Sequence, residues 1–486
     1  MANFPGLSGL GIGTLKMLQI SHISPKNRET IHEKSLHILE NTGVAFDYEP
    51  ALGLLKKHGA RIDGKTAYIP ANLVRECLAT CPASFSLEAR NSAKSVVFGQ
   101  KEDFLVLPNL GPIFIQDAEG QKRHGTMADY IDMTKLSQAS SVIDVVGSCP
   151  IDTVDVDADT KFLKMVYQSC RHSDKPVMCC TGTPKHTDRQ LKIVEISFGR
   201  PGIMKNKVIT GTSLSPLSPL AYAEDAAHAI MAFAERRQMV IVAVALMAGI
   251  NAPASIGGSS LMINTEFLAA MVLAQCAGPE TPVVYATTCS ASNLRNAAYV
   301  IGTPETTLLN GFAVQMGQYY NVPTRSVGAA SDAKTMDMQA GYEAMQNLLI
   351  ASLSGVDAIY ETLGVLESLL TVSYEKFMID QELIARVKSI SKGVDAEPAQ
   401  LHCQEIEETG IGGNFLIHPS TLKACRQRWE PTISDWWPYE KWMEDGSQDV
   451  IQKASALYKH VLKQAPESIL DPAVDKELVD YIEKCS

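Results

Sequence analysis

Short runs of apolar and β-branched residues recur along the middle of the chain, and each is followed by small or polar residues and a longer amphipathic stretch. Such a short run, bounded by turn residues, is typical of a buried strand, and strands that alternate with helical stretches predict βα units and a parallel sheet. The runs lie at residues 104–107, 142–146, 176–180, 208–212, 240–246, 282–287, 323–328, 358–361 and 415–418.

Some eight such units in one uninterrupted series favour a closed (β/α)8 barrel over an open doubly wound sheet. Residues 24–43 begin with Ser-Pro and end with Asn-Thr-Gly, which predicts a helix before the barrel. We therefore expect an α/β chain in three parts: a mostly helical N-terminal cap over residues 1–100, a (β/α)8 TIM barrel catalytic domain over 101–420 and a C-terminal arm over 421–486.

The tryptophans of the chain all fall in this arm, at Trp429, Trp436, Trp437 and Trp442. Such a stretch is more typical of an arm packed on a barrel or on a neighbouring subunit than of a ligand cage. A homo-oligomer is therefore expected.

Charge and targeting signals narrow the function. The chain has 486 residues, with 43 Lys and Arg against 54 Asp and Glu, and a net charge of −11. It lacks the basic surface that nucleic acids require. The apolar run at residues 239–250 is shorter than the about 20 residues that span a bilayer, so no membrane span is expected. Residues 1–10 do not resemble a signal peptide, which favours a cytoplasmic protein.

Cysteine and histidine give no sign of a metal site. The eleven cysteines are scattered and contain no Cys-x-x-Cys pair, so we expect them to be reduced and mostly buried. The eleven histidines include no zinc-binding helix pair, which disfavours a catalytic metal.

The carboxyl ends of barrel strands carry the active site in this fold. The polar and aromatic candidates at the expected strand ends are Asn109, Tyr285, Arg325, Tyr360, Glu361 and His418. Strand alternation predicts that Tyr360 and Glu361 point to opposite sides, with Glu361 favoured to face inward. For each candidate, a structural role in or behind the barrel wall is the alternative.

The strand of Arg325 runs into a turn of small residues, namely Gly328, Ala329, Ala330, Ser331 and Asp332. Small residues at this position leave room for a bulky group to approach. Asp332 could instead cap the following helix, and Arg325 could pair with an acidic neighbour outside the lumen.

Several motifs together resemble the trimethylamine methyltransferase family of corrinoid-dependent methyltransferases. The resemblance covers residues 24–440, and it rests on the motifs Gly-Thr-Pro-Glu at 302–305, Ser-Asp-Ala-Lys at 331–334, Gln-Ala-Gly-Tyr-Glu at 339–343, Gly-Gly-Asn-Phe-Leu at 412–416 and His-Pro at 418–419. It implies a (β/α)8 barrel, in agreement with the strand pattern.

The resemblance also points to one branch of the family. Archaeal trimethylamine enzymes of the family carry pyrrolysine just before Ser-Asp-x-Lys, where this chain has Ala330 or its neighbour Ala329. The chain therefore resembles the non-pyrrolysine branch, which demethylates quaternary amines. Glycine betaine is expected first and proline betaine next, followed by carnitine and γ-butyrobetaine.

Demethylation of a quaternary amine needs few catalytic groups. The nitrogen already carries its charge, so displacement releases a neutral amine without an acid, a base or a metal, and no catalytic residue is expected. The resemblance implies that Co(I) of a corrinoid attacks the methyl carbon. None of the eleven histidines follows an Asp by two residues, as in base-off corrinoid proteins, so a separate corrinoid protein is expected to supply it and no tightly bound cofactor is expected.

A betaine would meet two kinds of group in the barrel. Its carboxylate favours Arg325 or His418, and its ammonium favours Tyr285, Tyr360 and Glu361. The turn that would face the corrinoid comprises Gly328, Ala330, Ser331 and Asp332. Two other classes remain open: a lyase or aldolase that uses Lys334 as a Schiff-base amine, and a betaine-binding protein without catalysis.

Overall fold

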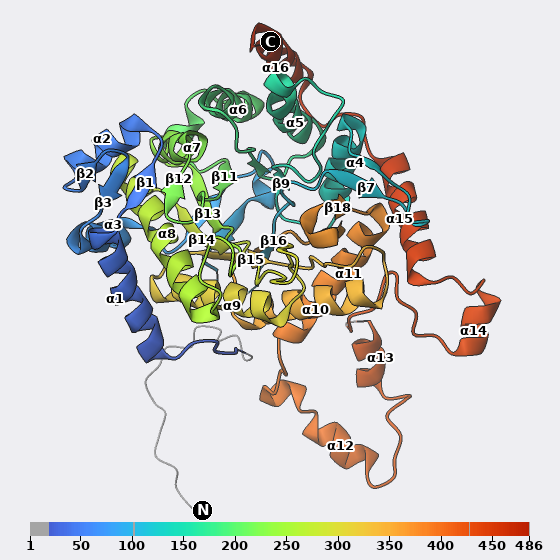
Figure 1. Cartoon of the computed structure of the whole chain (residues 1–486). Coiled ribbons are helices and arrows are strands. Elements are labelled where there is room, and N and C mark those ends of the chain that lie inside the picture. The colour runs from blue at the N-terminus through green and yellow to red at the C-terminus, as the bar shows by residue number, and fades with distance from the viewer. Residues whose placement is uncertain (1–18, 101–102, 427, 486) are drawn as a thin grey trace, which may run out of the picture.

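Eight short parallel strands lie at the centre of the molecule, and a helix follows each of them along the chain (Figure 1). The computed structural model describes residues 19–100, 103–426 and 428–485. The strands are β6 (Leu105–Val106), β9 (Val146–Gly147), β10 (Val177–Met178), β11 (Gly211–Leu214), β13 (Met239–Val244), β14 (Val283–Thr287), β15 (Thr324–Val327) and β16 (Ala358–Tyr360). The helices are α4 (Met127–Ala139), α5 (Ala158–His172), α6 (Pro184–Ser197), α7 (Glu224–Ala234), α8 (Ile256–Ala277), α9 (Pro304–Tyr319), α10 (Met338–Leu353) and α11 (Tyr374–Ser391).

Six of these strands form one parallel sheet in the order β11-β13-β14-β15-β16-β6, and β10 and β9 form a parallel pair. A backbone hydrogen bond joins the pair to each edge of the sheet. The N–H of Val145 donates to Val106 O over 3.2 Å, and the N–H of Cys179 donates to Gly211 O over 2.9 Å. The chain is therefore an α/β protein with a parallel sheet wrapped by helices, as the alternating pattern predicted.

Eight of the nine predicted strands overlap an observed strand. The prediction for residues 415–418 is wrong, because they form an exposed loop rather than a strand. The start of β11 is later than predicted because Val208 instead forms a parallel bridge with Leu87, which belongs to an N-terminal hairpin.

The N-terminal segment packs against the amino-terminal ends of the central strands. Helix α1 (Pro25–Asn41) begins at the predicted cap, where the Ser24 hydroxyl accepts a hydrogen bond from the Asn27 N–H. Strands β4 (Phe85–Leu87) and β5 (Val96–Phe98) pair as a hairpin. Leu87 and Phe98 of this hairpin pack among interior residues of the strands such as Met178 and Met239, so apolar side chains fill the amino-terminal end of the sheet interior. The N-terminal segment also contains β1 (Val44–Phe46), α2 (Glu49–Lys57), β2 (Arg61–Asp63), β3 (Thr66–Tyr68) and α3 (Ala71–Thr80), and its strands β1, β3 and β2 belong to one separate sheet.

Helix α8 is the most buried helix of the outer layer. Its 22 residues make it long and apolar enough to cross a membrane, which the sequence reading overlooked, and most of it is buried inside the protein. It packs against α1, α3, α7 and α9 and against β13. In the part of the chain that the structure describes, no second helix meets that length and composition. Residues 1–10, which bear on the signal-peptide prediction, lie outside the described residues.

A small sheet lies over the carboxyl ends of two central strands. Strands β7 (Phe114–Gln116) and β8 (Lys122–His124) follow β6, and β17 (Val365–Leu366) and β18 (Thr371–Val372) follow β16. They pair in the order β17-β18-β7-β8. Because β6 and β16 are neighbours, their following loops meet and build this cover together.

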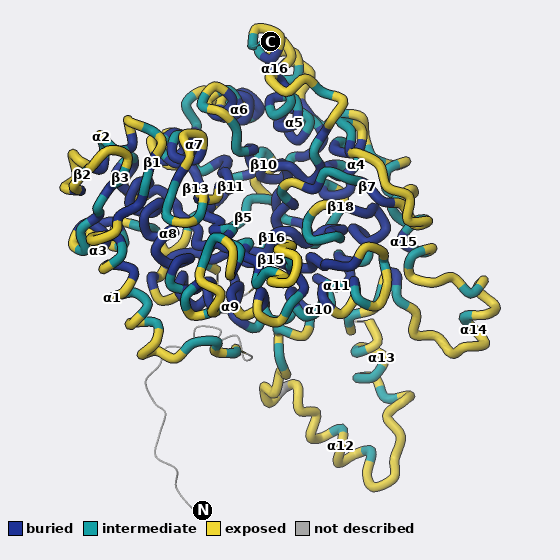
Figure 2. Tube along the Cα trace, in the orientation of Figure 1, coloured by how far each residue is buried: buried dark blue, intermediate teal, exposed yellow. Residues whose placement is uncertain are grey.

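The C-terminal part contains α12 (Cys403–Thr409), α13 (Pro419–Cys425), α14 (Tyr439–Glu444), α15 (Val450–Gln464) and α16 (Pro472–Cys485). Helix α15 packs on α11 and α4, and α16 packs on α5 and α6. Helices α12 and α13 instead extend away from the other helices (Figure 1). Figure 2 shows that this extension is mostly exposed.

Candidate active site at the carboxyl ends of the strands

Three predicted residues meet at the carboxyl ends of β15 and β16. The guanidinium carbon of Arg325 lies 4.1 Å from the ring centroid of Tyr360, and the Glu361 carboxylate is close enough for each of the two charges to act on the other's pKa. The register pairs Arg325 with Ala358 and Val327 with Tyr360, so Arg325 and Tyr360 lie on the same face of the sheet, two residues apart along the strands. This end of a parallel sheet is where chemistry is done in barrel enzymes.

Arg325 is buried, and only part of its guanidinium is used by the protein. Nη1 donates to Thr287 O over 3.1 Å and to Thr288 Oγ1 over 2.8 Å. Nε is buried and has no hydrogen-bond partner among the described residues. An arginine presents Nε and the neighbouring Nη as a fork that matches a carboxylate. The free side of this fork is therefore suited to a carboxylated ligand.

The alternative that Arg325 pairs with an acid outside the lumen is wrong. Within residues 19–100, 103–426 and 428–485, no carboxylate lies within 4.0 Å of its guanidinium nitrogens, and its ring contact is with Tyr360 of the interior cluster. Burial lowers the pKa of Arg325, and the Glu361 charge opposes that effect.

Glu361 follows the last residue of β16 and has φ 52°, a left-handed conformation that is uncommon for glutamate. Both carboxylate oxygens accept the Leu110 N–H over 3.2 Å. Burial raises the pKa of Glu361 to about 7, although Arg325 and the Leu110 N–H favour the charged form. Glu361 is thus a buried carboxyl that changes charge near neutral pH.

The prediction that Tyr360 and Glu361 must point to opposite sides is wrong. Alternation holds only while the chain is extended, and the strand ends at Tyr360. The left-handed turn at Glu361 brings its carboxylate to the Leu110 N–H in the loop after β6, while the Tyr360 hydroxyl pairs with Ser148 Oγ over 2.7 Å. Both side chains therefore belong to the site.

Tyr299 is a site residue that the sequence reading missed. Its hydroxyl donates to the backbone oxygen of Thr288 over 2.7 Å, and Thr288 is also a hydrogen-bond partner of Arg325. Burial raises the pKa of Tyr299. Its ring packs with Ile301, Val327 and Ala330. It lies in the loop between β14 and α9, where no strand or helix pattern fixes its position.

Asn109 holds the loop after Glu361 in place. Its Oδ1 accepts the N–H groups of Thr362 and Leu363 over 2.9 and 3.1 Å, and its Nδ2 donates to Leu363 O over 2.7 Å. Its amide is therefore occupied by the backbone that carries Glu361, and Asn109 is a positioning residue.

The predicted corrinoid-facing turn is buried, including Gly328, Ala330, Ser331 and Asp332. The loop after β16 lies against it, and a Cβ at Gly328 would stand 1.8 Å from Thr362 Oγ1, so only glycine fits there. On the other side Ile301 packs on Ala330. Two loops therefore occupy the room that the small residues leave.

Asp332 joins those two loops. Its carboxylate accepts the N–H groups of Ile301 and Gly302 over 2.8 and 2.9 Å and the Ser368 hydroxyl over 2.7 Å. The alternative that Asp332 caps the next helix is wrong, because Asp337 caps α10. Ser331 donates to Glu343 Oε2 over 2.7 Å, which ties the turn to α10.

Two predicted residues lie elsewhere. Tyr285 of β14 points outward, since its ring lies 3.9 Å from that of Phe267 on α8 and its hydroxyl donates to Asn264. His418 belongs to the extended α12–α13 segment, where its Nδ1 lies 3.3 Å from Glu405 Oε2. Neither meets Arg325 and Glu361. Lys334 is exposed and donates to Asp332 O, so it lacks the buried setting that a Schiff-base lysine requires.

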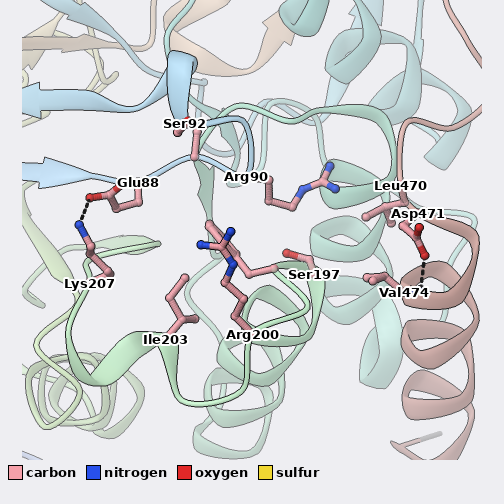
Figure 3. A pocket seen from close by; sticks show the side chains of 12 residues that line it. Glu88, Arg90, Ser92, Ser197, Arg200, Ile203, Lys207, Leu470, Asp471 and Val474 are labelled. Atoms are coloured by element: carbon pink, nitrogen blue, oxygen red, sulfur yellow. Dashed lines mark hydrogen bonds and ion pairs between the residues drawn. The ribbon is translucent and has the colours of Figure 1, made fainter.

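A cavity of about 340 Å³ lies beside the loop that leads into β11, near the amino-terminal ends of the strands (Figure 3). Several of its charged side chains already have partners within the protein. Lys207 pairs with Glu88 over 2.8 Å, and Arg90 donates to the carbonyls of Cys170 and Ser173. Figure 3 shows Arg200 between the Lys207 pair and Leu470. In barrel folds this end serves stability, so we assign the active site to the opposite end.

The chain is similar to known methyltransferases over most of its length. A glycine betaine methyltransferase of Desulfitobacterium hafniense is 35% identical over 455 residues, which cover 93% of this chain and 95% of that protein. A proline betaine:corrinoid methyltransferase of Eubacterium limosum is 29% identical, over 84% of this chain and 86% of that protein.

The fold has a solved counterpart. The crystal structure of the Methanosarcina barkeri monomethylamine methyltransferase (MtmB) matches with a TM-score of 0.53 at 10% identity, over 90% of this chain and 88% of that one. The family model described as trimethylamine methyltransferase (MTTB) matches residues 13–486. With a buried, charge-bearing site at the strand ends and a match over nearly its whole length, the chain belongs to the trimethylamine methyltransferase family, and it is a methyltransferase.

Proposed function

We propose that this protein transfers a methyl group from a zwitterionic quaternary amine, with glycine betaine first and proline betaine next, to Co(I) of a separate corrinoid protein. The observation that carries the proposal is the buried Arg325, whose Nε is unpartnered beside the Glu361 carboxyl. One site thus offers a free cationic fork and an acidic group, and a betaine has the complementary pair of charges.

The two ends of the substrate would bind to different groups. Arg325 binds the carboxylate through its free Nε side, because Thr287 and Thr288 hold only Nη1. Glu361 in its charged form attracts the ammonium, and the rings of Tyr360 and Tyr299 supply aromatic surface. The two betaine relatives among the compared proteins favour this substrate class.

In the proposed reaction these residues position the substrate and transfer no proton. A quaternary nitrogen leaves as a neutral amine, so no group has to protonate it. The corrinoid, when bound to its own protein and reduced, supplies the nucleophile for the methyl carbon. Arg325, Glu361 and the tyrosines orient the amine, and the buried surroundings exclude water.

The fold that we propose for this activity is a closed (β/α)8 barrel with the site at its mouth. The hydrogen bonds from Val145 to Val106 and from Cys179 to Gly211 support closure, because they bridge both gaps between the β10–β9 pair and the six-stranded sheet. The corrinoid would approach from the side of Gly328–Asp332. Because the loops around Thr362 and Ile301 cover this turn, they would have to move apart during transfer.

The test is a methyl-transfer assay with the full chain. Purified protein is mixed with a reduced corrinoid protein and a panel of glycine betaine, proline betaine, carnitine, γ-butyrobetaine and trimethylamine, and the absorbance of the corrinoid is followed. Transfer from a betaine is the expected result. Transfer from trimethylamine alone would overturn the substrate assignment, and betaine binding without any transfer would identify a binding protein.

A further inference from the structure

Residues 392–426 and 428–431 leave the helical layer after α11 and return to the same helix, and we call them the α12–α13 excursion. The return is firmly held: Oε2 of Glu382 on α11 accepts the N–H groups of Thr432 and Ile433 over 2.9 and 2.6 Å. Ser434 donates its hydroxyl to the same carboxylate. The excursion is therefore a long extension with a fixed base.

The excursion exposes apolar side chains that nothing in the described chain covers. Neither α12 nor α13 contains a buried residue, and both are seven residues long. Isolated helices shorter than about 12 residues are marginal in water, so such short helices need a packing partner. The exposed apolar residues of the excursion are Ile406, Ile411, Leu416, Ile417 and Leu422, at 58 to 110% relative exposure.

The exposed charges on and directly after the two helices of the excursion differ in sign. Helix α12 carries Glu407 and Glu408 on exposed positions, whereas α13 carries Lys423 and is followed by the exposed Arg426 and Arg428. A second excursion placed by a two-fold axis brings the acidic α12 of one chain to the basic α13 of the other, twice. Contacts repeated in this way are typical of two-fold homodimers.

We propose that the α12–α13 excursion is the interface between two copies of this chain, each covering the apolar residues of the other. A stable interface buries about 800 Å² per partner, and five strongly exposed aliphatic side chains provide the apolar centre for such an area. A cavity of about 750 Å³ continues this surface beyond α13, between Cys425 and the exposed Trp436 and Trp437.

The position of the excursion favours a second copy over the corrinoid protein. The proposed methyl-transfer site lies at the ends of β15 and β16, whereas the excursion projects beyond α10 and α11 to the side of the molecule (Figure 1). A corrinoid must reach the strand ends, and the excursion does not lead there.

Molar mass by light scattering tests the interface with the full chain. We expect the wild type at a multiple of 52.8 kDa and the variant Leu416→Ser/Ile417→Ser at 52.8 kDa. The matched control is Val450→Ser/Val479→Ser, two partly exposed valines on α15 and α16, and it keeps the wild-type mass. A monomeric wild type, or an interface variant with the wild-type mass, would overturn the proposal.

A charge exchange keeps the proposal testable if the serine variant does not fold. We expect Glu407→Lys/Glu408→Lys and Lys423→Glu/Arg426→Glu each to be monomeric alone and to form a one-to-one complex when mixed. No complex on mixing contradicts the reciprocal arrangement. If the variants keep their mass but lose binding to the reduced corrinoid protein, the excursion belongs to that partner and the proposal fails. The masses are read without any methyl-transfer assay, so this result is independent of the proposed function.

Discussion

Arg325 stacks on Tyr360 with 4.1 Å between the guanidinium carbon and the ring centroid. Stacking uses the face of the guanidinium and leaves its edges for hydrogen bonds. One edge is occupied by Thr287 and Thr288, and the Nε side is free. The tyrosine thus fixes the direction in which the arginine presents its free donors, before any ligand arrives.

Replacement of Arg325 should weaken the binding of carboxylated amines. In Arg325→Ala, loss of a buried charged hydrogen bond should weaken the binding free energy of glycine betaine by about 2 kcal/mol. The KM for glycine betaine should therefore rise roughly 30-fold. Arg325→Lys keeps the charge without the fork and should recover only part of this loss. Steady-state methyl transfer measures both. Arg200→Ala, at the opposite end of the sheet, is the control, and an unchanged KM in Arg325→Ala would remove Arg325 from the pocket.

Glu361 should make substrate binding depend on pH. Its pKa is about 7, so the carboxylate that attracts the ammonium forms as the pH rises through neutrality. We expect KM for glycine betaine to fall between about pH 6 and about pH 8 in the wild type and to stay level in Glu361→Gln. Identical pH profiles for the two proteins would show that Glu361 does not face the cation.

The charged form of Glu361 should lower the free energy of unfolding. The folded-state pKa of about 7 lies above the ordinary value of 4.5, so the folded chain retains a proton that the unfolded chain loses between these values. The contribution of Glu361 to the free energy of unfolding therefore decreases as the pH rises from 4.5 to about 7. Glu361→Gln should raise Tm more at about pH 8 than at about pH 5. Glu119→Gln, on an exposed turn, is the control.

Loss of the Asp332 carboxylate should loosen two loops together. Asp332→Ala leaves the N–H groups of Ile301 and Gly302 without their acceptor and frees Ser368. A charged hydrogen bond contributes about 1.5 to 3 kcal/mol, so a drop of at least that size in unfolding free energy is expected. Denaturant titration measures the drop, and hydrogen exchange should speed up at residues 301–302. Unaltered hydrogen exchange at residues 301–302 would contradict the role of Asp332 in holding the two loops together.

Lys334 should be dispensable for catalysis. Because Lys334 is exposed, Lys334→Ala should keep methyl transfer. Treatment of the wild type with a carbonyl compound and borohydride should not modify Lys334 in preference to the other exposed lysines. Covalent trapping at Lys334 together with loss of activity in the variant would instead support the lyase or aldolase alternative.

The strand pattern predicted the central sheet well and the direction of its side chains poorly. Eight of the nine predicted strands exist because apolar runs between turn residues identify buried strands. Both faces of such strands are buried, so inward and outward positions carry similar residues, and the outward direction of Tyr285 could not be inferred. The run at 415–418 has the same apolar pattern but lies on the exposed α12–α13 excursion and forms no strand.

The candidate site combines residues that the strand ends indicated with residues whose positions depend on loops. Arg325, Tyr360 and Glu361 follow from their places in β15 and β16. The left-handed turn at Glu361 and the position of Tyr299 depend on how neighbouring loops meet, which periodicity does not encode. His418 was assigned through a strand that does not form.

The hairpin β4–β5 has a kinetic consequence for the proposed reaction. Apolar packing by Leu87 and Phe98 fills the amino-terminal end of the sheet interior. In the reaction proposed above, the amine and the corrinoid would therefore approach the site from the same, carboxyl-terminal end of the strands. The proposal then predicts an ordered kinetic mechanism, in which the amine binds before the corrinoid protein and leaves after it.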